Sequence, residues 1–162
     1  MPDQQFTLHV DGEQKTVTCD PSVRVLWVLR DLLGIHGPKY GCGLDVCKAC
    51  TCHIDTGSGP KAFNPCSVQV GDLPAGAQIT TIEGLATNGT LHPMQQAWLD
   101  NDVGQCGYCQ PGQIMAAIAH VNEAKANNTP IDDSLFDEIR NICRCGTYHR
   151  IREAILEGAA KM

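Results

Sequence analysis

The chain has 162 residues, of which 43% are hydrophobic, enough for one ordinary domain or for two small ones. Its formal net charge of −6 argues against nucleic-acid binding, which needs a basic face. No stretch approaches the ~18 consecutive apolar residues that would indicate a membrane span.

Ten cysteines are the most unusual feature of the composition. Residues 1–5 are polar and acidic and are not followed by an apolar run, so no secretory signal is expected. We therefore expect a cytoplasmic protein, in which clustered cysteines indicate metal or redox chemistry rather than disulfides. Export as a folded complex on a partner's signal would leave no trace in this chain.

The first half of the sequence predicts a β-hairpin followed by a helix. Residues 6–10 and 15–19 alternate in polarity around Asp11-Gly12, a pair that is typical of a tight turn. A helix is expected to open at Pro21-Ser22 and to stop at Gly34. The predicted apolar stripe of this helix consists of Val25, Leu29, Leu32 and Leu33.

Further strands are predicted after a loop that is rich in glycine and cysteine. Residues 51–54, 63–70 and 78–82 have the composition of extended segments. The hairpin, the helix across it and these strands together predict an α+β domain of the β-grasp type over residues 1–82.

The second half of the sequence predicts a helical domain over residues 90–162. It follows a Gly-, Pro-, Thr- and Asn-rich stretch, so we place a linker near residues 82–90. The third of its helices is expected to bury Leu135, Ile139 and Ile142. Four short helices, together forming a four-helix bundle, are expected to begin at His92-Pro93, Gln110-Pro111, Asp132-Asp133 and Arg150.

Four cysteines of the first half have the pattern C-x4-C-x2-C…C. They are Cys42, Cys47, Cys50 and Cys66, and their spacing is that of plant-type 2Fe–2S ferredoxins. Three thiolates on one tight loop can converge on a small rhombic cluster when neighbouring glycines let the backbone approach the sulfides. A zinc site would favour two C-x2-C pairs, and a Rieske centre needs histidine ligands in both segments, so a 2Fe–2S cluster is the favoured interpretation.

Two other cysteines of the first half are interpreted as small buried hydrophobic residues. Cys52 follows Cys50 by two residues on a predicted strand, so both side chains could point the same way. The four thiols of the motif already complete a ligand set, which favours a packing role for Cys52 and for Cys19.

The second half contains a different cysteine pattern, C-x2-C…C-x-C. Cys106 and Cys109 lie on the turn into the second helix, and Cys143 and Cys145 lie between the third and fourth helices. Residues i and i+2 diverge on a regular helix, so Cys143 and Cys145 need an extended or turn conformation to share one site. Taken alone, this pattern fits zinc as well as a 2Fe–2S cluster.

The order of the two patterns, with Q-C-G-Y-C-Q-P-G over residues 105–112 and I-C-R-C-G-T-Y over residues 142–148, identifies a family. From Phe6 to Leu156 the chain resembles the small iron–sulfur subunit of the xanthine dehydrogenase/aldehyde oxidoreductase family of molybdenum hydroxylases. It is similar to the isoquinoline 1-oxidoreductase type in particular. This resemblance implies a plant-type ferredoxin-like (β-grasp) domain followed by an all-α four-helix-bundle domain, each with one 2Fe–2S cluster.

The resemblance also implies the residues that hold the cofactors. The cluster distal to molybdenum would be bound by Cys42, Cys47, Cys50 and Cys66. The proximal cluster would be bound by Cys106, Cys109, Cys143 and Cys145. Gln105 would touch the molybdopterin cofactor of a large partner subunit, and Cys145 would be the ligand nearest to the pterin. No catalytic residue is expected in this chain.

An electron-transfer subunit of a molybdenum hydroxylase or dehydrogenase is the function that this resemblance implies. Single electrons would pass from the partner's molybdopterin centre through the two clusters to a flavin subunit, a cytochrome c subunit or a soluble carrier. An independent electron carrier and a zinc-bearing scaffold are the alternatives. Lys48 stands where many relatives have glycine and Cys52 where an apolar residue is common, so the potential of the distal cluster stays open.

Overall fold

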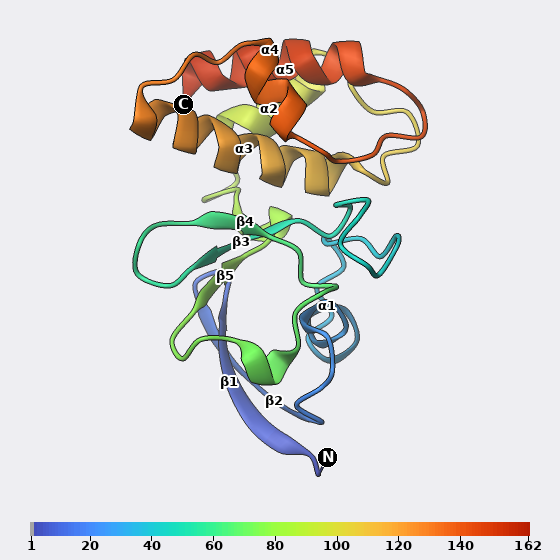
Figure 1. Cartoon of the computed structure of the whole chain (residues 1–162), viewed down its shortest axis with the longest axis vertical. Coiled ribbons are helices and arrows are strands. Elements are labelled where there is room, and N and C mark those ends of the chain that lie inside the picture. Colours follow the sequence, from blue (N-terminus) through green and yellow to red (C-terminus); the bar gives the residue numbers. More distant parts are fainter. Residues whose placement is uncertain (1) are drawn as a thin grey trace.

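A computed structural model describes residues 2–162 and shows a sheet domain and a helical domain stacked along the long axis of the molecule (Figure 1). The sheet has five strands in the order β2-β1-β5-β3-β4. The strands are β1 (Gln4–Val10), β2 (Glu13–Cys19), β3 (Cys52–Asp55), β4 (Lys61–Phe63) and β5 (Gln78–Thr80). β1 pairs antiparallel with β2 and parallel with β5, while β3 pairs antiparallel with β4 and β5.

The predicted hairpin between β1 and β2 is confirmed. Asp11 and Gly12 both have positive φ, at 53° and 79°, which is the conformation that a two-residue hairpin turn requires. The Asp11 carboxylate also accepts hydrogen bonds from the backbone amide and the hydroxyl of Thr81, at 2.7 and 2.8 Å. The hairpin turn is thereby joined to the segment that leaves β5.

One helix crosses the sheet and contributes Val25, Val28 and Leu29 to the first core. α1 (Val25–Trp27) continues directly into the π-helical turn η1 (Val28–Leu32). Val25 and Leu29 are fully buried as predicted, but Leu32 is 49% exposed. The predicted stripe is wrong at Leu32, which points to solvent from the π-helical turn closed by the i→i+5 hydrogen bond from Leu33 N–H to Val28 O. Leu33 is partly buried and packs against the first core, as predicted.

The predicted extended segment over residues 63–70 is also wrong beyond Phe63. The chain turns at residues 64–67, and residue Gln69 makes only an isolated bridge to Arg24. Proline at position 65 cannot donate to a strand ladder, which favours a turn there. This turn places Cys66 in a small buried cluster with Leu26 and Cys50.

The second domain is helical, with α2 (Pro93–Asp100), α3 (Gln110–Asn127), α4 (Asp133–Glu138) and α5 (Tyr148–Lys161). His92 and Gln95 form a capping box at the start of α2. α5 crosses α2 closely, since a Cβ atom on Gly158 would lie 2.7 Å from the Met94 sulfur. The prediction for α4 is wrong at its end: the helix stops at Glu138, and Ile142 is 49% exposed on the following loop.

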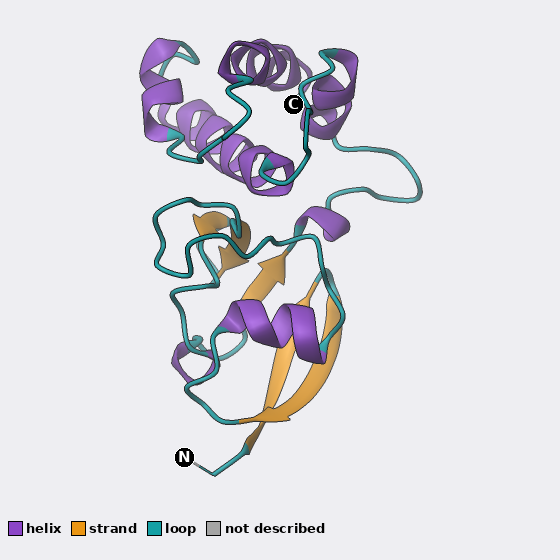
Figure 2. Cartoon of the chain, turned by 90° about the vertical axis from the view of Figure 1, so that its right-hand side faces the viewer, coloured by secondary structure: helices purple, strands orange, loops and turns teal. Residues whose placement is uncertain are grey.

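The two domains have separate hydrophobic cores and meet along α3 (Figures 1 and 2). The cysteine loop of the first domain faces the start of α3, β3 faces its middle and β4 faces its C-terminal half (Figure 1). The 3-10 turn η3 (Ile82–Gly84) leads from the sheet to the helices, and Ile82 packs against the helical core. The boundary near residues 82–90 stays a prediction. Within residues 2–162, no helix combines the length and apolar character needed to cross a membrane.

Candidate iron–sulfur sites

The cysteines of the first motif lie together as two pairs of thiols. Cys50 and Cys66 are buried side by side, and their thiols are within hydrogen-bonding reach of each other. Cys42 and Cys47 form the second pair, on the more exposed part of the loop. Burial is the main reason that the pKa of Cys50 is raised to about 12. The uncharged thiol is therefore strongly favoured at Cys50 when no cation is near.

Backbone amides surround the Cys42 sulfur. The N–H groups of Leu44, Val46 and Cys47 donate to it at 3.4, 3.2 and 3.3 Å. The Cys42 N–H donates in turn to the Cys47 sulfur at 3.3 Å. Burial opposes the charged form of Cys42, but these amides outweigh it and lower the thiol pKa to about 7. The loop is thus built to stabilise negative charge on sulfur.

Left-handed backbone conformations allow the loop to wrap in this way. Gly43, Asp45 and Lys48 have φ of 69°, 59° and 59°. Gly41 is needed for a different reason, because a Cβ atom there would lie 2.6 Å from the Cys47 sulfur. Lys48 adopts the same conformation without being glycine, and its ammonium is paired with the Asp45 carboxylate at 2.8 Å. The Lys48 carbonyl faces the helical domain, where it accepts a hydrogen bond from the Asn141 side chain.

Cys52 and Cys19 are both buried, as predicted. Cys52 is 0% exposed, and its thiol lies 3.4 Å from the carbonyl oxygen of Cys50. Burial, followed by the charge on Cys50, raises the pKa of Cys52 well above its ordinary value. Both properties suit a small packed side chain beside the first thiol set.

The second thiol set also consists of two pairs. Cys106 lies within hydrogen-bonding reach of Cys145, and Cys109 within reach of Cys143. Residues 143–146 form a turn, closed by a hydrogen bond from Gly146 N–H to Cys143 O at 3.2 Å, so the i, i+2 pair is not on a helix. Cys109 and Cys143 are buried, whereas Cys106 is exposed and Cys145 half-buried. The set therefore extends from the interior to the surface.

Three side chains near the second set were not predicted as part of the site. Gln110 places its amide nitrogen 3.7 Å from the Cys109 sulfur while its carbonyl oxygen accepts a close hydrogen bond from the Trp98 indole. The Thr147 hydroxyl lies 3.5 Å from the Cys143 sulfur, and Tyr148 OH accepts the Cys143 N–H at 2.8 Å. All three residues belong to the two cysteine motifs of the sequence. The motifs do not indicate which sulfur or backbone group each side chain contacts.

The two buried thiols of the second set, Cys109 and Cys143, have pKa values shifted in opposite directions. Burial, and then the hydrogen bond with Cys143, raises the pKa of Cys109 to about 12. Burial acts in the same direction on Cys143, but hydrogen bonds from Thr147 and Cys109 outweigh it and lower the pKa of that thiol. Gln105 is exposed next to Cys106, at the surface end of the set.

The donor chemistry of both sets fits a 2Fe–2S cluster. Such a cluster takes four thiolates, two on each iron, and each set supplies four thiols in two pairs. Over residues 2–162, no group of three or more His, Cys, Asp or Glu side chains gathers closely enough to hold one metal ion. The amides and hydroxyls directed at Cys42 and Cys143 provide the hydrogen bonds to sulfur that tune such clusters.

The chain is similar in sequence to known iron–sulfur families and proteins. Residues 8–73 match the family described as the 2Fe-2S iron-sulfur cluster binding domain, and residues 81–156 match the [2Fe-2S] binding domain. The chain is 40% identical to one of the subunits of nicotinate dehydrogenase from Pseudomonas putida, over 95% of this chain and 94% of that one. It is 41% identical to the alpha subunit of isoquinoline 1-oxidoreductase from Brevundimonas diminuta, over 93% and 94% of the two chains.

Two solved structures share the fold of both domains. A chain of quinoline 2-oxidoreductase from Pseudomonas putida 86 superposes with a TM-score of 0.86 at 27% identity, over 99% of this chain and 96% of that one. The aldehyde oxidoreductase from Desulfovibrio desulfuricans gives a TM-score of 0.83 at 33% identity. There the match covers 99% of this chain but only 17% of the other, because that protein carries much more than this unit.

A ferredoxin-like sheet domain and a helical domain, each with four paired thiols, define a two-cluster iron–sulfur protein. The chain belongs to the family of small 2Fe–2S subunits of molybdenum hydroxylases, which confirms the resemblance stated from its motifs. The predicted fold class, the two 2Fe–2S cofactors and the electron-transfer role are confirmed with it.

Proposed function

We propose that this chain relays single electrons from the molybdopterin centre of a large partner subunit, through two 2Fe–2S clusters, to an external acceptor. The observation that carries the proposal is the arrangement of eight cysteine thiols as two sets of two pairs. The proposed ligands of the first cluster are Cys42, Cys47, Cys50 and Cys66. The proposed ligands of the second are Cys106, Cys109, Cys143 and Cys145.

The thiol pairs support a proposed assignment of ligands to the two irons of each site. In the first set, Cys42 and Cys47 would hold one iron, and Cys50 and Cys66 the other. In the second set, Cys106 would share an iron with Cys145, and Cys109 with Cys143. Each bound cluster accepts one electron, so a two-electron oxidation in the partner leaves as two single-electron steps.

The exposed end of the second set is the proposed entry for electrons. Gln105 and Cys106 are exposed, and Cys145 is half-buried beside Cys106. We assign Gln105 to contact with the edge of the partner's molybdopterin and Cys145 to the ligand nearest the pterin. The buried pair, Cys109 and Cys143, would then face the next step along the chain.

The loop around Cys42 is the proposed exit. Leu44 is 77% exposed and Val46 61% exposed, so two apolar side chains stand at the surface beside the Cys42 sulfur. Such residues suit docking of a redox partner. We propose a flavin subunit, a cytochrome c subunit or a soluble carrier as that acceptor. A reducing cytoplasm suits the ten cysteines, all of which are free thiols.

Electron paramagnetic resonance of the anaerobically reduced protein tests the proposal. Two distinguishable S = 1/2 signals that integrate to two spins per chain are expected. One spin per chain would contradict the second assignment and leave zinc as the occupant of that set. A silent, colourless and folded protein would overturn the electron-transfer role, and purification without a molybdenum-containing partner would favour an independent carrier.

A further inference from the structure

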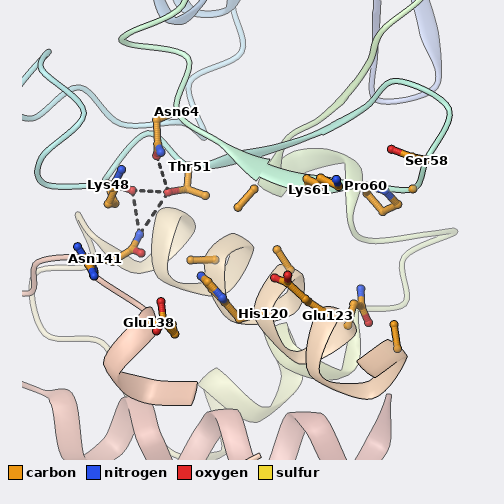
Figure 3. A pocket seen from close by; sticks show the side chains of 17 residues that line it. Lys48, Thr51, Ser58, Pro60, Lys61, Asn64, His120, Glu123, Glu138 and Asn141 are labelled. Atoms are coloured by element: carbon orange, nitrogen blue, oxygen red, sulfur yellow. Dashed lines mark hydrogen bonds between the residues drawn. The ribbon is translucent and has the colours of Figure 1, made fainter. Parts of the chain in front are cut away.

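A buried amide joins the two cysteine loops across the domain interface. Asn141 is 4% exposed and lies two residues before Cys143. Its side-chain nitrogen donates to the carbonyl oxygen of Lys48 at 2.8 Å and lies 3.4 Å from the Thr51 hydroxyl (Figure 3). The residue lies at one end of an interdomain groove of about 760 Å³ that runs between β4 and α3.

Both ends of this contact are held firmly. The backbone carbonyl of Asn141 accepts a hydrogen bond at 3.0 Å from the side chain of Gln113, which is 1% exposed on α3. On the other side, the Thr51 hydroxyl is within 2.7 Å of the Lys48 carbonyl and 2.9 Å of the Asn64 side chain. Asn141 is therefore fixed to α3 through its backbone and to the cysteine loop through its side chain.

The residue that follows Asn141 makes the most direct link between the two thiol sets. The backbone N–H of Ile142 donates to the carbonyl oxygen of Cys47 at 3.1 Å. One hydrogen bond thus connects a cysteine of the first set to the residue next to Cys143. Ile142 is 49% exposed, so burial of its side chain does not hold this hydrogen bond in place. Asn141 is the buried anchor beside it.

The domains are docked by other contacts as well. His53 on β3 meets the Met115 carbonyl on α3, and Gly112 on α3 lies against the Lys48 and Ala49 carbonyls. These contacts lie on α3 rather than on the segment that carries Cys143 and Cys145. Loss of the Asn141 amide would therefore loosen that segment while the domains stay together.

We propose that Asn141 is a positioning residue that sets the spacing and coupling between the two clusters, an inference that rests on the proposed function. By holding residues 141–143 against Cys47 and Lys48, it keeps the Ile142–Cys47 hydrogen bond closed. The distance between the two clusters then has one fixed value, so every electron that passes from the second cluster to the first crosses the same distance.

The variant Asn141→Ala tests this inference, with Asn122→Ala as the matched control. Asn122 is exposed on α3 and lines the same groove, so the control makes the same substitution without a buried contact. Two readouts are needed: the magnetic splitting between the two fully reduced clusters, and the exchange rate of the Ile142 amide. Iron and sulfide content and spin quantitation show that both clusters are present.

The expected result for Asn141→Ala is full cluster content with a weakened or broadened splitting and about tenfold faster exchange at Ile142, equivalent to roughly 1.4 kcal/mol. Asn122→Ala should match the wild-type protein in both readouts. Unchanged splitting and exchange in a fully loaded Asn141→Ala protein would overturn the inference. A wild-type protein with fewer than two signals would instead contradict the proposed function.

A second variant is needed if the cavity left by Asn141→Ala leads to loss of the second cluster. Asn141→Asp keeps the volume of the side chain but cannot donate to the Lys48 carbonyl at neutral pH. The same loss of splitting and the same faster exchange are expected. Wild-type values in a fully loaded Asn141→Asp protein would overturn the inference as well, because the donated hydrogen bond would then be dispensable.

Discussion

The imidazole Nε2 of His53 lies 2.7 Å from the carbonyl oxygen of Met115, so a strand of the first domain is hydrogen-bonded to the central helix of the second. His53 is 4% exposed, and burial lowers its pKa although the Met115 carbonyl acts in the opposite direction. His92, which caps α2 by accepting the Met94 N–H at 3.1 Å, also has a lowered pKa through burial and the neighbouring His53. Both histidines are therefore neutral in the folded protein near pH 7.

We expect this pair to make stability fall as the pH falls. The unfolded chain takes up protons near the ordinary histidine pKa of about 6.5, while the folded chain resists protonation until lower pH. The stabilisation is fully present above that ordinary value and is lost progressively as the pH falls below it, toward the lowered pKa of the folded state. Thermal unfolding midpoints measured from pH 8 down to about pH 5 check this. His53→Gln keeps an amide donor for the Met115 carbonyl, and its unfolding midpoint should fall less steeply with decreasing pH than that of the wild-type protein. A fall as steep as in the wild-type protein would contradict the role of His53.

The close approach of Gly112 to the cysteine loop predicts a sensitive position. A Cβ atom there would lie 2.6 Å from the Lys48 carbonyl oxygen and 2.8 Å from that of Ala49. Because both neighbours are backbone, Gly112→Ala must displace α3 or the loop. We expect a loss of roughly 1–3 kcal/mol in the free energy of unfolding, typical of overpacking.

Gly104→Ala is the control for this substitution, since a Cβ atom on Gly104 would meet nothing within 4 Å. Its unfolding midpoint should stay close to that of the wild-type protein. A Gly112→Ala protein that is equally stable would show that the domains can separate slightly at no cost, which would contradict the tight interface.

The two thiol sets could be predicted because cysteine spacing is written directly in the chain. Positions 42, 47, 50 and 66 predict a ferredoxin loop without any knowledge of packing. The pairing of Cys106 with Cys145 was not readable in the same way. It depends on how the turn at residues 143–146 sits beside the start of α3, which is a tertiary arrangement.

Local propensity failed where tertiary contacts decide the conformation. A regular helical period predicts that Leu32 is buried, but the π-turn at residues 28–32 leaves it exposed to solvent. The same apolar period continues to Ile142 and predicts too late an end for α4. In the structure the backbone N–H of Ile142 instead donates to the carbonyl oxygen of Cys47 in the other domain. The contacts of Asn141 escaped prediction for the same reason, since its partner lies 93 residues away in the chain.

Cys50 and Cys52, two residues apart, should respond differently to the same substitution. Cys50 pairs with Cys66. The Cys52 thiol instead donates to the carbonyl oxygen of Cys50 at 3.4 Å. Cys52→Ala should keep both clusters and cost about 1 kcal/mol through the small cavity left in the core. Cys50→Ala should abolish the first cluster and remove one of the two spins. Iron content and double-integrated electron paramagnetic resonance spectra measure both effects. Loss of a cluster in Cys52→Ala would contradict the packing role and indicate that Cys52 is a ligand.

Removal of iron should loosen the cysteine loops and leave the two hydrophobic cores folded. The first core, around Val10, Leu29 and Ile79, and the second, around Met94, Ile118 and Ile155, are built largely from apolar side chains outside the loops. Metal binding is coupled to the folding of the ligand segments, so a chelated, thiol-reduced protein loses that stabilisation where the ligands lie. Hydrogen exchange followed by mass spectrometry is expected to speed up in residues 41–50 and 143–147. Peptides from β1 and β2 serve as the internal control and should keep their protection. Complete unfolding would show that the cores depend on the clusters, and unaltered exchange in both loops would contradict iron binding by these thiols.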